Sequence, residues 1–171
     1  WELPEENAEY EVYKEFAKIY FTPYLKSIKE CRNFNLCFGE KYYYLDGTES
    51  TPSDNKHYVI VLNNGVAVTF YGRNDKKFIE ISFDINGAKK PNTVGKDRFS
   101  LILSKSATPY AAVIGKFDKP GLYLYGQGNT IDYLKTERYA CSKTQGTEFR
   151  GLFCGAWIMQ NNWKIPDDYP W

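Results

Sequence analysis

The sequence has only one histidine, His57, and one methionine in 171 residues. Serine and cysteine nucleophiles need a nearby base, which is most often histidine, so this scarcity argues against such catalysis. The longest apolar runs fall short of the ~20 residues that a bilayer requires. Charge is also balanced, because 22 Lys and Arg face 21 Asp and Glu. We therefore expect a soluble, non-catalytic chain with no membrane span and no nucleic-acid partner.

The chain is instead rich in aromatic residues, with 15 Tyr, 11 Phe and 4 Trp. Aromatic side chains favour β-structure, so a large helical bundle is not expected. A length of 171 residues suits one domain, because domains commonly run to about 100–200 residues. We therefore expect a single domain over residues 1–171.

Apolar residues recur every three or four positions from about residue 5 to residue 30. This spacing predicts an amphipathic helix that buries one side. Pro23 lacks the N–H that would bond the carbonyl of Ile19, so a break into two helical pieces is expected there.

Alternating apolar residues follow between about residues 57 and 104. Two of these runs flank the turn sequence Asn63-Asn64-Gly65, which predicts a β-hairpin, and two further runs alternate in the same way. We expect an α+β fold in which the helix packs on an antiparallel sheet of about four strands. Residues 105–171 are punctuated by glycine and are expected to be loop-rich.

Four cysteines invite a disulfide interpretation. Cys31 and Cys37 lie six residues apart, and Cys141 and Cys154 bracket a second local segment. Two short-range disulfides are the simplest assignment, and reduced structural thiols remain the main alternative. A zinc site would want C-x-x-C pairs or accompanying histidines. Disulfides would place the chain at a cell surface or outside the cell.

The segment from Asp84 to Asp97 lies between two predicted strands. Its D-x-N-G opening resembles the start of a calcium loop, in which Asp84, Asn86 and Asp97 would supply oxygens. Ala88 and Gly95 occupy positions where such a loop has further ligands, and the local charge is positive. The alternative is a structural loop that is held by Asx-turns.

Aromatic residues also gather in the C-terminal region. Tyr123, Tyr125, Trp157 and Trp163 could form a stacking platform for sugars. This arrangement would indicate a secreted or surface module that binds carbohydrate or another ligand. A small secreted enzyme is a third possibility, which would require a pocket that holds His57 and a carboxylate.

Three features together resemble a known family. They are the interrupted aromatic helix that runs into Cys31, the motif D-x-N-G-x-x-x-P-N-x-x-G-x-D from Asp84 to Asp97, and the pair Cys141 and Cys154 before the sequence AWIMQNNWK. This combination resembles the bacterial prepilin-type proteins, which comprise the type IV pilins and the type II secretion pseudopilins.

The resemblance implies a non-catalytic structural subunit in the bacterial cell envelope or on the cell surface. Its partners would be other pilin-like subunits and the secretion or pilus assembly machinery. In that family a hydrophobic N-terminal helix anchors the subunit in the membrane and then packs in the filament core. This chain begins at Trp1 without such a helix, so we expect it to be the soluble head, which would meet the membrane only through the missing anchor.

Overall fold

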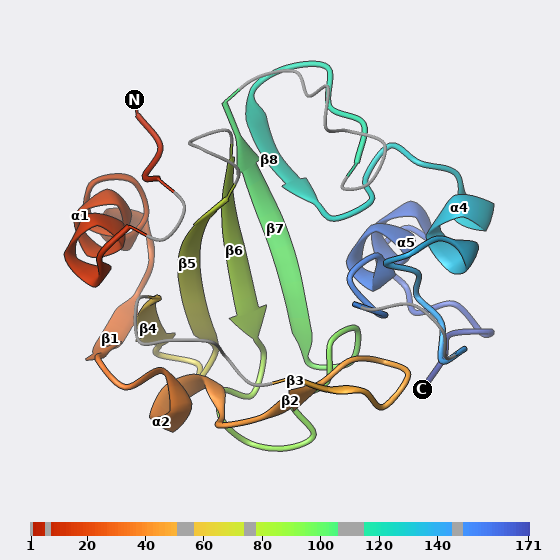
Figure 1. Ribbon diagram of the computed structural model, residues 1–171, viewed down its shortest axis with the longest axis horizontal. Coiled ribbons are helices and arrows are strands. Elements are labelled where there is room, and N and C mark those ends of the chain that lie inside the picture. The colour runs from red at the N-terminus through yellow and green to blue at the C-terminus, as the bar shows by residue number, and fades with distance from the viewer. Residues whose placement is uncertain (1, 6–7, 51–56, 74–77, 106–114, 145–148) are drawn as a thin grey trace.

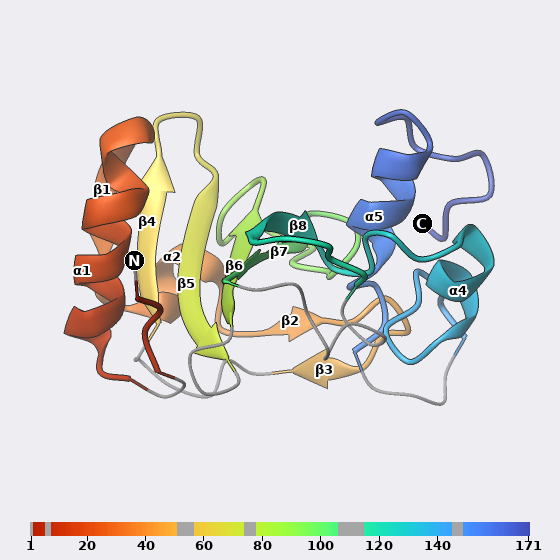
Figure 2. The ribbon, with the colours of Figure 1, turned by 90° about the horizontal axis from the view of Figure 1, so that it is seen from above.

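The computed structural model describes the chain in six stretches, residues 2–5, 8–50, 57–73, 78–105, 115–144 and 149–171. They form an α+β fold around a central sheet (Figure 1). The N-terminal helix lies at one end of the longest axis, and two C-terminal helices lie at the other end (Figures 1 and 2). Within the described stretches, no helix combines the length and the apolar character needed to cross a membrane.

Six antiparallel strands form the main sheet, in the order β1-β4-β5-β6-β7-β8. The four central strands are consecutive in the chain and form the predicted meander, including the hairpin at Asn63-Asn64-Gly65. The strands of this sheet are β1 (Ser27–Cys31), β4 (Tyr58–Leu62), β5 (Ala67–Arg73), β6 (Phe78–Asp84), β7 (Arg98–Ser104) and β8 (Gly121–Leu124).

The remaining elements cover the sheet and its ends. A two-stranded ribbon lies along one side of the sheet (Figure 2). It consists of β2 (Tyr42–Tyr43) and β3 (Glu49–Ser50). The helices are α1 (Tyr10–Tyr20), the 3₁₀ turn η1 (Thr22–Tyr24), α2 (Phe34–Phe38), α4 (Ile131–Thr136) and α5 (Cys154–Gln160).

The predicted helix from residue 5 to residue 30 is too long. Its break at Pro23 is confirmed, because α1 ends at Tyr20 and η1 follows. The second helical piece is wrong, since Ser27–Cys31 forms β1 and pairs with β4. Pairing with β4 satisfies backbone groups that a short helix after the proline would leave open at its ends.

The expectation of about four strands is also too low, because β1 and β8 are added as the two edge strands of the sheet. β8 pairs with β7 from Ser104 to Leu101, inside the region expected to be loop-rich. That region also contains α4 and α5. A strand of four residues is too short for alternation to stand out in the sequence.

Both faces of the sheet carry a hydrophobic core. On one face, α1 buries Tyr13, Phe16 and Ala17 against the strands, and Leu101 and Leu103 of β7 join this cluster. Ile102 points the opposite way and joins a cluster with the C-terminal helices. The sheet is therefore the layer that connects the N-terminal and C-terminal parts of the molecule.

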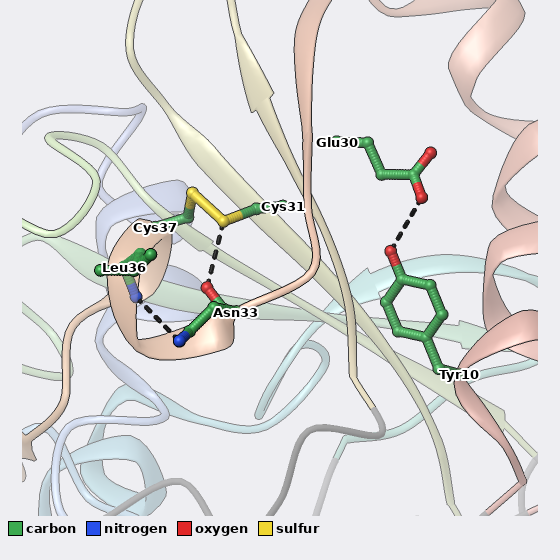
Figure 3. Close-up of a disulfide and its surroundings, with 6 residues drawn as sticks. All are labelled: Tyr10, Glu30, Cys31, Asn33, Leu36 and Cys37. Atoms are coloured by element: carbon green, nitrogen blue, oxygen red, sulfur yellow. Dashed lines mark hydrogen bonds between the residues drawn. A yellow bond between two sulfur atoms is a disulfide. The ribbon is translucent and has the colours of Figure 1, made fainter.

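The structure has the two disulfides that the spacing predicts, Cys31–Cys37 and Cys141–Cys154. The first joins β1 to α2 (Figure 3), where Asn33 caps the helix by accepting the backbone N–H of Leu36. The second joins the segment after α4 to the start of α5. Each bridge thus fixes a short helix against its neighbour in sequence.

A polar contact fixes α1 to the edge strand β1. Glu30 accepts a hydrogen bond from the hydroxyl of Tyr10 at 3.0 Å (Figure 3). It also forms an ion pair with Lys14 at 2.8 Å. The hydrogen bond from Lys14 lowers the pKa of Glu30. Both donors come from α1, so this carboxylate ties the helix to the first strand.

Candidate functional site

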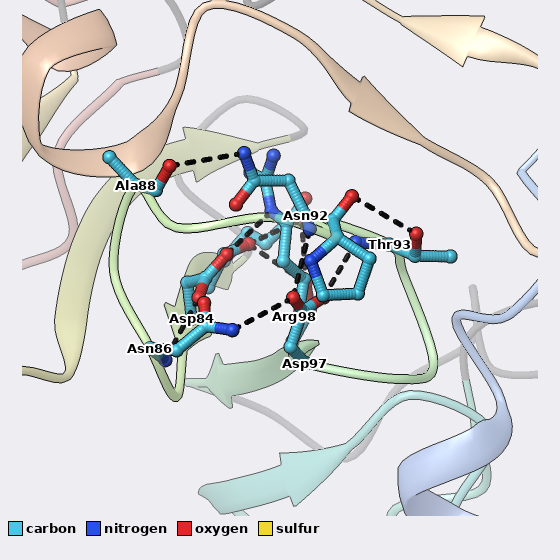
Figure 4. A network of polar contacts seen from close by, with 11 residues as sticks. Asp84, Asn86, Ala88, Asn92, Thr93, Asp97 and Arg98 are labelled. Carbon is cyan, nitrogen blue, oxygen red and sulfur yellow. Dashed lines mark hydrogen bonds and ion pairs between the residues drawn. The ribbon is translucent and has the colours of Figure 1, made fainter.

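The loop between β6 and β7 is organised around the carboxylate of Asp97 (Figure 4). Its Oδ1 accepts the backbone N–H of Thr93 at 2.6 Å, and its Oδ2 accepts that of Asn92 at 2.8 Å. The side-chain amide of Asn86 also donates to Oδ2, at 3.3 Å. Asp97 is almost completely buried, so these donors replace the water that its charge would otherwise bind.

Asp84 and Arg98 face each other across β6 and β7, next to this loop (Figure 4). Asp84 Oδ2 lies 4.0 Å from Arg98 Nε, and Oδ1 accepts the backbone N–H of Asn86 at 3.1 Å. Burial raises the pKa of Asp84 to about 7, and the backbone N–H of Asn86 and the guanidinium only partly oppose this effect.

The guanidinium of Arg98 also connects the loop to the elements before it. It lies 4.3 Å from the ring centroid of Phe38 and 4.0 Å from that of Tyr42. Such cation–π contacts are worth about 0.5–2 kcal/mol. The loop is therefore fixed to α2 and β2 as well as to its own strands.

The side-chain oxygens of this loop do not suit a calcium ion in the present arrangement. Calcium takes about six to eight oxygens, whereas both oxygens of Asp97 already accept N–H groups. Asn86 Oδ1 has no hydrogen-bond partner among the described residues, but it supplies a single oxygen. No group of three or more His, Cys, Asp or Glu residues suited to a metal occurs in the described part of the chain. Calcium binding at Asp84, Asn86 and Asp97 stays a prediction.

A second carboxylate network lies on the face of the sheet opposite α1, and the sequence analysis missed it. Glu80 Oε1 accepts hydrogen bonds from Ser82 at 3.2 Å and from Ser100 at 3.3 Å, and Oε2 accepts one from Tyr125 at 3.2 Å. Ser82 and Ser100 are paired in register. The alternation of β6 places Glu80 and Ser82 on one face, but it does not reveal that this face is covered.

His57, the residue on which an enzymatic alternative depends, packs among aromatic rings. It stacks on Tyr71 with centroids 4.4 Å apart and meets the ring of Phe34 edge-on. Its Nδ1 lies 3.5 Å from the hydroxyl of Thr69. These contacts are those of a packed histidine at the start of β4.

The four aromatic residues named for ligand binding do not share a surface. Trp157 and Tyr125 are buried in the C-terminal core. Tyr123 stacks on Phe117 at 4.1 Å between centroids. Trp163 is 69% exposed. The structure therefore does not bring these rings together into a platform, and ligand binding at them stays a prediction.

Trp163 lies in a hydrogen-bonded turn after α5. Both Asn162 and Trp163 have a left-handed backbone, with φ of 56° and 61°. The turn is closed by the N–H of Trp163, which donates to the carbonyl of Ile158 at 2.9 Å, and by the side chain of Asn161, which donates to Lys164 O at 2.9 Å. The indole is thus exposed on a fixed backbone.

A groove of about 570 Å³ lies between α1 and residues 2–5. Its lining includes Leu3 and Phe16, which are buried, and Val12 and Ile19, which are 45% and 59% exposed. The helix positions share one side because they are spaced by three or four residues. The groove is therefore mainly apolar.

The wall of this groove depends on Gly72 of β5. A Cβ at Gly72 would lie 2.5 Å from the carbonyl oxygen of Glu5 and 2.9 Å from that of Pro4. Real Cβ atoms do not approach so closely, so only glycine lets the segment cross the strand here. The hydroxyl of Tyr13 donates to the same Glu5 carbonyl at 2.7 Å and holds the segment against α1.

Comparison with known proteins gives one family assignment. A model described as a family of unknown function, DUF6613, matches residues 2–171. The chain belongs to this family. Neither the search of curated proteins nor the search of solved structures returned a match. The DUF6613 match includes the Asp97 loop, the α1 groove and the turn at Trp163.

Proposed function

We propose that the chain is the globular head of a pilin-like or pseudopilin-like subunit, which assembles into a filament on the bacterial envelope and performs no catalysis. The observation that carries the proposal is the apolar flank of helix α1, which is left exposed beside its buried side. Its inner side packs on the sheet through Tyr13, Phe16 and Ala17. The flank next to this inner side exposes Val12 and Ile19 in an apolar groove, which a neighbouring subunit would bury.

The two disulfides support an extracytoplasmic location, because disulfides persist in oxidising compartments. The partners of the head are other subunits of the filament and the machinery that assembles them. Attachment to the membrane belongs to a hydrophobic helix before residue 1. The polar loop from Asp84 to Asp97 then acts as internal support for the sheet rather than as a reaction centre.

The proposal is tested by locating the protein in the cells that make it. Surface filaments are sheared from the cells and pelleted, and the pellet is digested without reductant. We expect mass spectrometry to find the linked peptides that contain Cys141 and Cys154 in the pellet. Recovery only as free protein in the medium, or only as reduced protein inside the cells, would refute the proposal.

A further inference from the structure

The segment after α5 and the groove on α1 lie at opposite ends of the molecule. α1 and α5 occupy the two ends of the longest axis in both views (Figures 1 and 2). Trp163 follows α5 by three residues, and the groove is built from α1 and residues 2–5. The two features therefore cannot meet within one chain, but they can meet between two copies.

The two surfaces are complementary in charge, and both are partly apolar. Trp163, Lys164 and Ile165 form an exposed projection with a cation between two apolar side chains. The groove is apolar and has two exposed carboxylates in its lining, Glu2 and Glu5. Its volume of about 570 Å³ falls within the range of about 300–1,000 Å³ that receives compact organic groups such as an indole.

The backbone at the projection supports a role in recognition. Trp163 is a bulky residue with φ of 61°, a conformation that costs about 1–2 kcal/mol and that glycine would adopt without strain. The hydrogen bonds that close the turn offset this cost, and they hold a side chain that is 69% exposed. Tryptophan is also among the residues that most often dominate the energy of an interface.

We propose that the projection Trp163–Ile165 of one copy docks in the α1 groove of the next, with Lys164 facing the carboxylates of Glu2 and Glu5. This contact joins two different surfaces, so it repeats head to tail and produces an open chain of subunits rather than a closed dimer. The inference rests on the proposed function, because it specifies which surfaces of neighbouring heads meet in the filament.

The test measures self-association of the purified, oxidised chain by sedimentation equilibrium. A small contact is expected to be weak, so concentrations run to about 1 mM, which corresponds to the weak end of specific binding. Trp163→Ala should weaken association by about 30-fold or more. Trp171→Ala is the matched control, because it removes another exposed tryptophan near the C-terminus and should leave association unchanged.

Complementary defects give the sharper result. Val12→Lys obstructs the groove and leaves the projection intact, whereas Trp163→Ala leaves the groove intact. Each variant alone should stay monomeric, and an equimolar mixture should form heterodimers that do not extend. The charge-swapped pair Glu2→Lys and Lys164→Glu, combined in one chain, should recover part of the association that Lys164→Glu alone loses. Near-ultraviolet circular dichroism confirms that each variant is folded.

A wild-type chain that stays monomeric at 1 mM would overturn the inference. Unchanged association of Trp163→Ala, or an equal loss with Trp171→Ala, would also overturn it. These outcomes are distinct from failure of the proposed function, which depends on whether the protein is found in sheared filaments. A protein found in filaments whose Trp163→Ala variant associates normally keeps the function and loses the docking contact.

Discussion

Trp163 shows how a single residue can be placed against its own conformational preference. A left-handed backbone is rare for a bulky side chain, yet Asn162 and Trp163 adopt it in succession. Hydrogen bonds to Ile158 O and Lys164 O close the turn around them. The turn therefore fixes the position of the indole at a cost to the stability of the isolated chain.

Replacing this tryptophan by glycine should stabilise the chain. Trp163→Gly removes backbone strain of about 1–2 kcal/mol. Glycine also makes the unfolded chain more flexible, which reduces this gain in stability by about 0.5–1 kcal/mol. Urea unfolding should therefore show a net gain of roughly 0.5–1 kcal/mol. Trp163→Ala keeps the strain and serves as the control. A loss above about 1 kcal/mol for the glycine variant would show that the indole packs within the chain.

Asp84 makes stability depend on pH. Its pKa rises from the ordinary 3.8 to about 7 because of burial. Between these two values the unfolded chain releases the proton and the folded chain keeps it, so the free energy of unfolding should fall as pH rises from 4 to 7 and level off above. At lower pH both states hold the proton, and this contribution to stability is fully present.

The measurement is urea unfolding between pH 4 and pH 8. Asp84→Asn carries no charge to titrate, so the variant should lose the part of the pH dependence that the wild type shows over this range. Asp118→Asn, at an exposed position, should keep it. Parallel pH profiles for Asp84→Asn and the wild type would contradict the assignment.

At the scale of elements, the loop of residues 85–97 shows how a carboxylate can organise a connection. The two backbone N–H groups that Asp97 accepts belong to residues that are themselves buried, Asn92 and Thr93. A buried donor without a partner costs about 1–3 kcal/mol. Asp97 therefore sets the path by which the chain returns from β6 to β7.

Removal of this acceptor should be costly. Asp97→Ala leaves two buried N–H groups unpaired and should destabilise the chain by about 2–5 kcal/mol in urea unfolding. Asp97→Asn retains one oxygen acceptor and should cost less. Addition of 5 mM calcium to the wild type should leave the melting temperature unchanged, because the carboxylate is already occupied by N–H groups. A calcium-dependent rise would instead support the calcium prediction at Asp84, Asn86 and Asp97.

The sequence indicates the central elements because their patterns are local. The turn Asn63-Asn64-Gly65 and the alternation of β6 and β7 are visible without any tertiary contact. β1 is different, since the apolar spacing through Tyr24 and Ile28 mimics a helix and only pairing with β4 makes a strand. The Glu80 network was not predicted for the same reason. A polar face of a strand is covered only by residues distant in sequence, such as Tyr125.

The candidate surfaces were beyond sequence reasoning for a related reason. Trp163 and Trp157 are six residues apart, and the sequence does not distinguish them. In the structure Trp163 is exposed and Trp157 is buried. The groove requires residues 2–5 to cross β5 at Gly72, and no local pattern predicts such a crossing.

At the scale of the whole molecule, the sheet lies between its two largest hydrophobic clusters. The α1 cluster lies on one face and the C-terminal cluster on the other, and Leu101 contacts both. Central strands are held by neighbours on both edges as well as by side chains on their faces. The middle of the sheet should therefore be the most stable part of the fold.

Native-state hydrogen exchange should show this order. Amides of β5, β6 and β7 should exchange most slowly, at rates near those of global unfolding. Amides of the edge strand β8 should exchange at least about tenfold faster, because local opening exposes them without unfolding the remainder. Equal protection of β6 and β8 would show that the centre of the sheet and this edge unfold as one unit.

The crossing at Gly72 also determines how the molecule would carry tension. A pull on the chain from its N-terminal end reaches residues 2–5 first, where burial of Leu3 and the bond from Tyr13 to the Glu5 carbonyl resist it. The load then passes into α1, which packs on the face of the sheet. We expect the segment to peel away while the sheet stays intact, so that stretching removes one wall of the groove before any strand is lost.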